Sequence, residues 1–302
     1  MNALFNHPLR VVLDTDTYNE VDDQFALAHL LLSPDRIQLD AVYAAPFFNN
    51  RSTSPADGME RSFEEIHRVL DLVNPAQRPP VFRGSTRWMP DPVIAVSSDA
   101  VTDLITRAMA FPENGEKLHV VAIAAATNIA SALLIEPRIA SRIVVVWLGG
   151  HAPSWPHTDE FNLKQDIYAA RILLDHDVPL VLVPCNPVCS HMITTVAELE
   201  KHLEPHSRLG AYLTQIVRHY GNVSAGWSKV IWDIAATGYL IDQSWIRTVE
   251  APSPVLKDDL TWMTPTPPGR RTIRIAQEVN RNGILTDFFT KAASQPAAQL
   301  SQ

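Results

Sequence analysis

Residues 11–32 read VVLDTDTYNEVDDQFALAHLLL: an apolar, β-branched run, then an acidic stretch, then a second apolar run. The first run predicts a buried strand, and the last predicts a helix that begins near residue 23. The junction between them carries five carboxylates within ten positions: Asp14, Asp16, Glu20, Asp22 and Asp23. Like charges this close raise each other's pKa unless a cation neutralises them, so we expect a compensating charge at this junction.

The rest of the chain repeats the alternation of strand and helix. Buried strands are predicted in five apolar runs: LRVVLD, IQLDAVYA, LHVVAIAAA, RIVVVWLGG and VPLVLVP. Helical patterns lie at 23–33, 58–73, 98–109, 128–136, 166–175 and 193–203. This order predicts an α/β fold with a mostly parallel sheet flanked by helices. In such sheets ligands bind outside the carboxyl ends of the strands, which is where the aspartates lie.

Composition limits the classes of partner. The chain has 302 residues, of which 46% are apolar and 19% charged, so it can bury a sizeable core. Its formal net charge of -8 argues against a nucleic-acid surface, which needs clustered Lys and Arg. No apolar run approaches the roughly 20 residues that span a bilayer. The chain has two cysteines, Cys185 and Cys189. A single disulfide between them would not stabilise so long a chain, and two thiols alone make a poor zinc site. We therefore expect a cytoplasmic protein that binds neither nucleic acid nor membrane.

The simplest explanation for the carboxylates is helix capping, because acidic side chains are favoured in the first turn of a helix. Capping accounts for one or two of them, but not for Asp14 and Asp16, which belong to the strand end. Several carboxylates without a nearby His or Cys instead suit a hard cation, Ca²⁺ or Mg²⁺, bound through oxygen ligands.

A strand that ends in DTDT also fits an aspartyl-phosphate phosphohydrolase, with Asp14 as the nucleophile and Asp16 as the acid. Enzymes of that kind need a later metal motif rich in Gly-Asp. The sequence contains no Gly-Asp dipeptide, so it disfavours this interpretation.

Motifs along the whole chain resemble those of the inosine–uridine-type nucleoside hydrolase family. The first is Asp-x-Asp, a short loop, and then Asp-Asp at the start of a helix. The others follow in the family's order: AIAAATNIASALLIEP at 122–137, VVVWLGGHAP at 144–153, DEFNLKQDIYAARIL at 159–173 and KVIWDIAATGYLI at 229–241. The resemblance implies one open α/β domain over residues 1–302, assembled as a homodimer or homotetramer. It also implies Ca²⁺-dependent hydrolysis of the N-glycosidic bond of ribonucleosides, which gives ribose and free base.

The resemblance assigns roles to individual residues. The Ca²⁺ ligands would be the carboxylates of Asp16, Asp23 and Asp233 and the backbone carbonyl of Thr127. Mg²⁺ accepts the same oxygen donors, so the sequence does not separate the two ions. Asp16 and Asp233 are the expected catalytic carboxylates, and Asp16 would act as general base toward a water whose pKa the cation lowers.

The sugar and the base would be held by a second group of residues. Asp22 would accept a hydrogen bond from the ribose 2′-hydroxyl, and Glu160 and Asn162 would hold the 5′ and 3′ side. Asn49 or Asn50 would stabilise the positive charge that grows on the ribose. For some of these residues a purely structural role is also open. Thr127 and Asn128 can cap a helix, and Asp166 is assigned only to the start of the following helix.

The sequence departs from the family's pattern at two points. The loop between the second Asp and the Asp-Asp pair is TYNEV, five residues instead of three, so Tyr18, Asn19 or Glu20 can reach toward the site. Trp232 precedes the late aspartate, where many members have a histidine that protonates the leaving base.

Tryptophan cannot donate a proton at neutral pH, but its indole can stack on a base. Purine-preferring members resemble this chain in having Trp-Asp at that point, so we expect purine preference and a role in purine salvage. Trp88 is the candidate for the opposite face of the base. His151 and His157 lie in the loop after Gly-Gly, where a lone histidine is more often a bystander than a catalyst.

Two rival functions remain open. The longer loop is compatible with hydrolysis of another N-riboside, or of nucleosides without base preference. A non-catalytic protein that binds Ca²⁺ and ribose is a rival from a different class. The complete set of aspartates, Asp16, Asp22, Asp23 and Asp233, favours an enzyme over such a binding protein.

Overall fold

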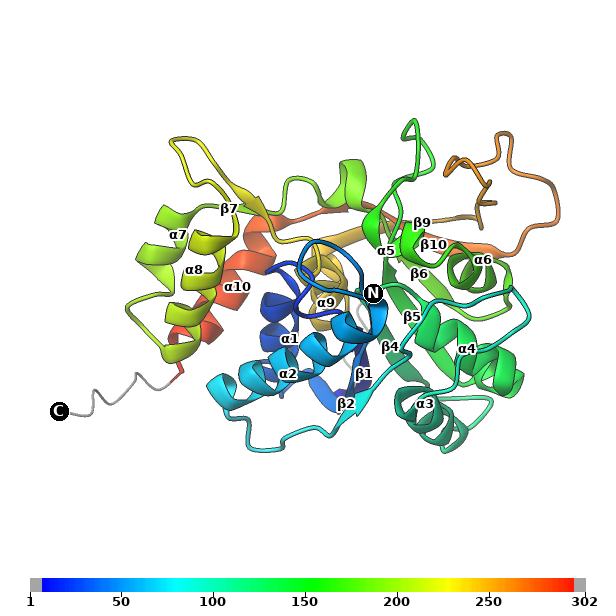
Figure 1. Cartoon of the computed structure of the whole chain (residues 1–302), viewed down its shortest axis with the longest axis horizontal. Coiled ribbons are helices and arrows are strands. Elements are labelled where there is room, and N and C mark those ends of the chain that lie inside the picture. The colour runs from blue at the N-terminus through cyan, green and yellow to red at the C-terminus, as the bar shows by residue number, and fades with distance from the viewer. Residues whose placement is uncertain (1–6, 296–302) are drawn as a thin grey trace.

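The computed structural model describes residues 7–295, and its central feature is an eight-stranded sheet between two layers of helices (Figure 1). In spatial order the strands are β3 (Val81–Arg83), β2 (Ile37–Ala44), β1 (Leu9–Thr15), β4 (Leu118–Ala122), β5 (Ile143–Leu148), β6 (Leu180–Val183), β10 (Thr272–Val279) and β9 (Ile246–Pro252). All neighbours pair in parallel except β10 and β9. The predicted open, mostly parallel sheet is therefore confirmed. The ends of the predicted domain, residues 1–6 and 296–302, lie outside the described residues.

Two groups of helices cover the two faces of the sheet. One face carries α1 (Asp23–Leu31), α2 (Pro55–Val73), α7 (Val196–His202), α8 (Arg208–Tyr220), α9 (Ile234–Ile241) and α10 (Arg281–Ala293). The other carries α3 (Asp99–Met109), α4 (Thr127–Ile135), α5 (Phe161–Gln165) and α6 (Ile167–Asp175). Short helical turns lie at Pro137–Ser141, Cys185–Cys189 and Gln243–Trp245, and a small antiparallel pair joins β7 (Ile193–Thr194) to β8 (Lys229–Val230).

The core forms on both faces because side chains alternate along a strand. Val11 and Leu13 of β1 pack into the apolar cluster under α1, α2 and α9, whereas Val12 packs into the cluster under α3 and α4. Strands buried on both sides read as continuous apolar runs, which is why β1, β2, β4, β5 and β6 were predictable from sequence.

The predicted helices are present with small shifts at their ends. The helix predicted at 58–73 begins earlier, at Pro55, because the Ser54 side chain accepts a hydrogen bond from the Asp57 N–H and proline is favoured in the first turn. Helices α5, α8 and α10 and strands β3, β7, β8, β9 and β10 were not predicted. Their moderate hydrophobicity and exposed faces, such as the pattern of β9, give a weaker sequence signal.

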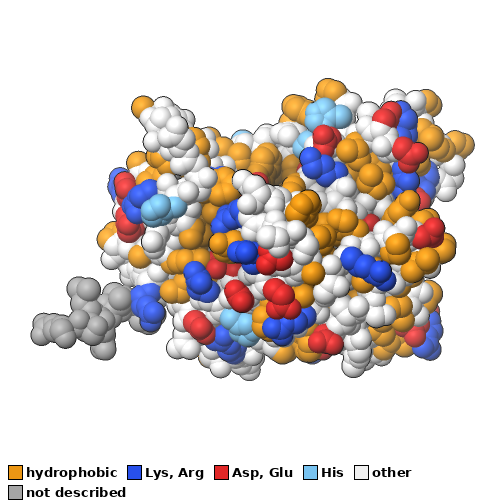
Figure 2. Space-filling view, in the orientation of Figure 1, with side chains coloured by type: hydrophobic (Ala, Val, Ile, Leu, Met, Phe, Trp, Pro, Cys, Tyr) orange, Lys and Arg blue, Asp and Glu red, His pale blue; other side chains and the backbone are white. Residues whose placement is uncertain are grey.

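Charges of both signs are interspersed on the face shown in Figure 2, over the part of the chain that the structure describes. A nucleic-acid surface would instead gather Lys and Arg into a band. In residues 7–295 no helix combines the length and the apolar character needed to cross a bilayer.

Candidate active site

The acidic stretch lies at the carboxyl end of β1, beside the start of two packed helices. Asp14 is in β1, Asp16 follows it, and Asp22 and Asp23 begin α1. Asp233 precedes α9, which packs directly against α1. All five carboxylates are buried. Tertiary packing thus brings a residue from position 233 next to the acids of the first loop.

The buried acids have the properties of a cation site. One carboxylate oxygen from each of Asp22, Asp23 and Asp233 lies within 4.8 Å of the others. Both oxygens of Asp16 and Oδ2 of Asp23 are buried without a hydrogen-bond partner. Buried polar atoms are almost always paired, so these unpartnered oxygens fit a positively charged ligand. The donors are oxygens, which suits a hard divalent cation.

Burial is the largest influence on the acidity of these groups. It raises the pKa of Asp16 and Asp233 well above the usual range, and the neighbouring carboxylates raise it further. For Asp23, burial and then the charge of Asp22 raise the pKa to about 8. Without a cation the cluster therefore holds protons at neutral pH, and a bound divalent cation would displace them.

Asp14 belongs to a separate hydrogen-bond network. Its Oδ1 accepts from Asn128 Nδ2 at 2.7 Å, and Asn128 Oδ1 accepts at 2.8 Å from both the N–H and the hydroxyl of Ser85. Burial raises the pKa of Asp14 to about 7, although the bond from Asn128 lowers it. Asn128 thus ties the end of β1 to the loop after β3. Neither Thr127 nor Asn128 caps α4, because the N-cap residue is Ala126 and no side chain caps the helix.

The longer loop supplies an ion pair at the edge of the cluster. Lys229 Nζ lies 2.5 Å from Glu20 Oε2 and 3.7 Å from Asp22 Oδ1, and the Lys229 side chain is 7% exposed. Burial lowers the pKa of Lys229, but Asp22 and then Glu20 outweigh it, so the pKa is raised overall. The backbone N–H of Trp232 donates to Asp22 Oδ2 at 3.0 Å. Asp22 is therefore oriented and partly neutralised by residues next to Asp233 in sequence.

Lys229→Met is expected to destabilise the protein by about 3 kcal/mol, because it leaves the buried Asp22 and the partly exposed Glu20 without their cation. Urea unfolding measures the change. The matched control is Lys257→Met, which removes an exposed ion pair with Asp259 (2.9 Å) and is expected to change stability far less, because solvent screens that pair. Equal losses for the two variants would contradict a structural role for the buried pair.

A cavity of about 300 Å³ opens beside the acids. That volume is at the lower end of the range for small-molecule sites. Its lining includes five residues predicted from sequence: Asp22, Glu160, Asn162, Trp232 and Asp233. The structure therefore gathers acids, sugar-binding candidates and one indole around a single cavity, with Asp16 and Asp23 buried beside it.

Glu160 and Asn162 are held firmly in place. Glu160 begins α5, and its carboxylate accepts three backbone N–H groups: Asn162 at 3.0 Å, Leu163 at 3.0 Å and Gly150 at 2.7 Å. Burial raises the pKa of Glu160, while these bonds act to lower it. Asn162 Nδ2 donates to the carbonyl of Leu148 at 3.0 Å. Both side chains are thus fixed across the end of β5, which favours a binding role.

Besides Asp16 and Asp23, three further predicted residues, Asn49, Trp88 and Thr127, do not line the cavity. Asn49 donates through Nδ2 to the carbonyl and side-chain oxygen of Asn19, at 3.2 and 3.3 Å, and it is Asn19 that lines the cavity. The Thr127 hydroxyl donates to Asp166 Oδ2 at 2.7 Å. Trp88 is half-buried in the loop whose Met89 N–H also donates to Asp166, which itself caps α6 as predicted.

Other lining residues were not singled out from sequence as site residues. Ile123 follows β4, Leu148 ends β5, and Cys185 and Asn186 follow β6. Their position at the carboxyl ends of parallel strands was the available signal. From the longer loop, Asn19 and Glu20 line the cavity, whereas Tyr18 turns away to stack its ring against Arg51, with 4.3 Å from ring centre to guanidinium carbon.

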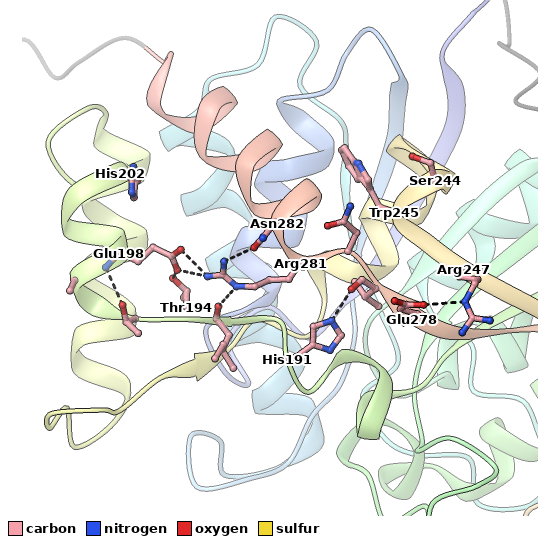
Figure 3. Close-up of a pocket in the computed structure, with 15 residues that line it drawn as sticks. His191, Thr194, Glu198, His202, Ser244, Trp245, Arg247, Glu278, Arg281 and Asn282 are labelled. Carbon is pink, nitrogen blue, oxygen red and sulfur yellow. Dashed lines mark hydrogen bonds and ion pairs between the residues drawn. The ribbon is translucent and has the colours of Figure 1, made fainter.

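A larger hollow of about 1100 Å³ lies elsewhere, between β7, α7 and the junction of β10 with α10 (Figure 3). Its charged side chains are already paired. Arg281 donates to both carboxylate oxygens of Glu198, at 2.8 and 2.6 Å, and Arg247 donates to Glu278 at 3.1 Å. Among the described residues that line it, none holds a buried polar side-chain atom without a partner. The acidic cavity is therefore the candidate active site.

Comparison with known proteins agrees with this geometry. The family model described as inosine-uridine preferring nucleoside hydrolase matches residues 11–286. No curated protein sequence matches the chain. Among solved structures, an inosine-guanosine nucleoside hydrolase has a TM-score of 0.76 at 17% identity, with 96% of this chain and 100% of that chain covered.

Two further structures have the same fold. A plant nucleoside hydrolase has a TM-score of 0.72 at 20% identity, covering 95% of this chain and 99% of its own. A purine-preferring ribonucleoside hydrolase from Gardnerella vaginalis has a TM-score of 0.71 at 20% identity, covering 95% and 98%. At these identities the structural matches establish the fold.

Proposed function

The chain belongs to the inosine-uridine preferring nucleoside hydrolase family, and on that basis we propose that it hydrolyses the N-glycosidic bond of purine ribonucleosides with the help of Ca²⁺. The products are ribose and the free base. The observation that carries the proposal is the cluster of buried carboxylates, several of their oxygens unpartnered, beside a cavity of nucleoside size. We also expect a homodimer or homotetramer and a cytoplasmic role in purine salvage.

The cation would be held by Asp16, Asp23 and Asp233 together with a backbone carbonyl from the segment after β4. The family resemblance points to Thr127 for that carbonyl, whereas Ile123 is the residue of the segment that lines the cavity. When bound, Ca²⁺ would lower the pKa of a water molecule and so ease its deprotonation. Mg²⁺ is the alternative ion.

The chain's own residues supply the remaining steps. Asp16 accepts the proton of the attacking water, and Asp22 accepts a hydrogen bond from the ribose 2′-hydroxyl. Positive charge that develops on the ribose is stabilised by the surrounding carboxylates. Water attacks the anomeric carbon from the face opposite the departing base, which inverts its configuration, as in inverting glycosidases. A site that bonds the 2′-hydroxyl in this way disfavours 2′-deoxynucleosides.

The experiment that tests the proposal measures reducing-sugar release from inosine, guanosine, adenosine, uridine and cytidine, with Ca²⁺ and with EDTA. Turnover that favours the purines and stops in EDTA is the expected result. Turnover of uridine faster than inosine would contradict purine preference. Binding of ribose without turnover of any nucleoside would support the non-catalytic binding protein. Turnover of a different N-riboside would replace purine ribonucleosides as the proposed substrate.

Trp232→Leu is expected to lower kcat/KM for inosine by about tenfold or more, because base stacking on an aromatic ring is worth roughly 1–3 kcal/mol. Trp232 lines the cavity and Trp88 does not, so Trp88→Leu is the matched comparison and should have a smaller effect. Steady-state kinetics on inosine and uridine measure both variants. A greater loss for Trp88→Leu would reverse the assignment of the two indoles.

A further inference from the structure

Helix α1 contains a histidine, His29, in the otherwise apolar run FALAHLL at 25–31. Its side chain is fully buried, and the centre of its ring lies 5.7 Å from that of Phe288 on α10. Burial of an imidazole costs free energy unless its nitrogens are hydrogen-bonded, whereas the neighbouring leucines pack without such a cost. Its hydrogen bonds therefore distinguish His29 from the rest of the helix.

The ring of His29 connects α1 to two other helices. Its Nε2 lies 2.9 Å from Asp287 Oδ2 on α10, and its Nδ1 lies 3.3 Å from the Thr237 hydroxyl on α9. Burial lowers the pKa of His29 and outweighs the opposite influence of Asp287, so at neutral pH the ring carries one proton. Lys291 Nζ also donates to Asp287, at 2.7 Å, and a carboxylate can only accept. The proton of the ring is therefore on Nε2, and Nδ1 accepts a hydrogen bond from Thr237.

The Thr237 hydroxyl shares its one proton between two acceptors. Besides His29 Nδ1, its oxygen lies 3.1 Å from the carbonyl oxygen of Ile234, in the preceding turn of α9. Both distances exceed the usual value for a hydroxyl donor, as expected for a proton shared in a three-centre bond. Each nitrogen of the His29 ring thus has a partner, with donor facing acceptor, and the orientation of the ring is fixed.

This link lies behind the acidic cluster. Helices α1, α9 and α10 pack against one another (Figure 1), with Asp22 and Asp23 at the start of α1 and Asp233 just before α9. At the rise of an α-helix, His29 is about 9 Å along α1 from Asp23, and Thr237 is about 6 Å along α9 from Asp233. The hydrogen bond between His29 and Thr237 therefore limits how far α1 can slide along α9.

The cation site depends on the relative position of these two helices. One carboxylate oxygen from each of Asp22, Asp23 and Asp233 lies within 4.8 Å of the others, so α1 carries two of the acids and α9 the third. A shift of one helix along the other changes those distances, and metal–oxygen distances vary by only about 0.2 Å in a well-formed site. Helix α10 limits movement from its own side, because a Cβ at Gly238 of α9 would lie 2.9 Å from Ile284 Cδ1.

We propose that His29 is a positioning residue, which fixes α1 against α9 and α10 and so sets the geometry in which Asp23 and Asp233 bind the cation. The inference rests on the cation site of the proposed function. His29 touches neither the cation nor the substrate and acts through the two helices. It makes α10, none of whose residues lines the cavity, part of the support of the metal site.

The test is calorimetric titration of Ca²⁺ into metal-free protein, for the wild type, His29→Leu, His29→Gln and Thr237→Val. His29→Leu removes both bonds of the ring and is expected to weaken Ca²⁺ binding about fivefold or more. Thr237→Val keeps the branched shape, removes only the hydroxyl and should also weaken binding. His29→Gln keeps one donor and one acceptor, so it should bind Ca²⁺ more tightly than His29→Leu.

The matched control is Tyr43→Phe. It removes another buried hydrogen bond, of 2.9 Å, which joins Tyr43 on β2 to Asp103 on α3, on the opposite face of the sheet. We expect its Ca²⁺ affinity to stay within about twofold of the wild type, because it leaves α1 and α9 untouched. Melting temperatures of all variants in EDTA separate a loss of stability from a loss of Ca²⁺ affinity.

Two results would overturn the inference while leaving the proposed function intact. One is Ca²⁺ affinity in Thr237→Val and in any folded His29 variant equal to that of the wild type. The other is a loss in Tyr43→Phe as large as in His29→Leu, because affinity would then follow stability instead of helix position. A wild type that binds Ca²⁺ but hydrolyses no nucleoside contradicts the proposed function, and the affinities still decide the inference. A wild type that binds neither Ca²⁺ nor Mg²⁺ overturns both.

Discussion

Asp16→Asn is expected to lower kcat for inosine by about a thousandfold, within the range of 10²–10⁴ for loss of a general base. The amide cannot take the proton of the attacking water, and it also removes a charged ligand from the cation. Both oxygens of Asp16 are buried without a hydrogen-bond partner, so the side chain does not stabilise the fold through hydrogen bonds to its neighbours. Steady-state kinetics at saturating Ca²⁺ measure the effect.

The matched control for this variant is Asp14→Asn. Asp14 is two residues away and equally buried, but its Oδ1 accepts from Asn128, and an asparagine there can still accept that bond. We expect its loss of activity to stay below about tenfold. Asp16→Asn should also melt at or above the wild-type temperature without metal, because burial disfavours the charge that it removes. An inactive variant that melts well below the wild type would show misfolding and contradict the catalytic assignment.

Removal of the metal is expected to make stability depend strongly on pH. The pKa of Asp23 is raised from 3.8 to about 8, and burial also raises the pKa of Asp16 and Asp233. For an acid whose pKa is higher in the folded state, the stabilising contribution is complete below the unfolded value and is lost as pH rises through the folded value. In EDTA the melting temperature should therefore fall between pH 5 and pH 8.

Added Ca²⁺ should reverse this trend, because it binds the ionised carboxylates. At one hundred times its dissociation constant it contributes about 2.7 kcal/mol, or roughly 4 °C for a chain of this size. Differential scanning calorimetry at pH 5 and pH 8, with Ca²⁺ and with EDTA, measures both effects. A melting temperature that rises with pH in EDTA, or no response to Ca²⁺ at pH 8, would contradict a buried cation site. Asp16→Asn should respond less to Ca²⁺ than the wild type.

Residues whose role depends on their own strand or helix were predictable from sequence. Apolar runs buried on both faces identified β1, β2, β4, β5 and β6, and the parallel sheet followed from their alternation with helices. Parallel strands present their carboxyl ends at one edge of the sheet, where ligands bind. The position of Asp16 directly after β1 therefore predicted that the site lies at this edge. Family motifs extended this to Asp233, which the packing of α9 on α1 brings to the first loop.

Side-chain contacts between distant segments needed the tertiary structure. Asn49 reaches the cavity only through Asn19, a residue of the longer loop. The same loop places Glu20 against Lys229, more than two hundred residues away, and no local pattern in sequence indicates that pair. His151 could not be separated from His157 by sequence, since both lie in one loop and only one is buried in the cavity.

The sequence by itself determined the α/β architecture, the acidic edge of the sheet and the family, because strand and helix periodicity and ordered motifs are local properties of the chain. Tertiary structure alone decided which side chains share the cavity, which acids lack partners and which histidine lines the cavity. Those properties depend on distances and burial that arise when remote segments pack together, and such packing leaves no periodic trace in the sequence.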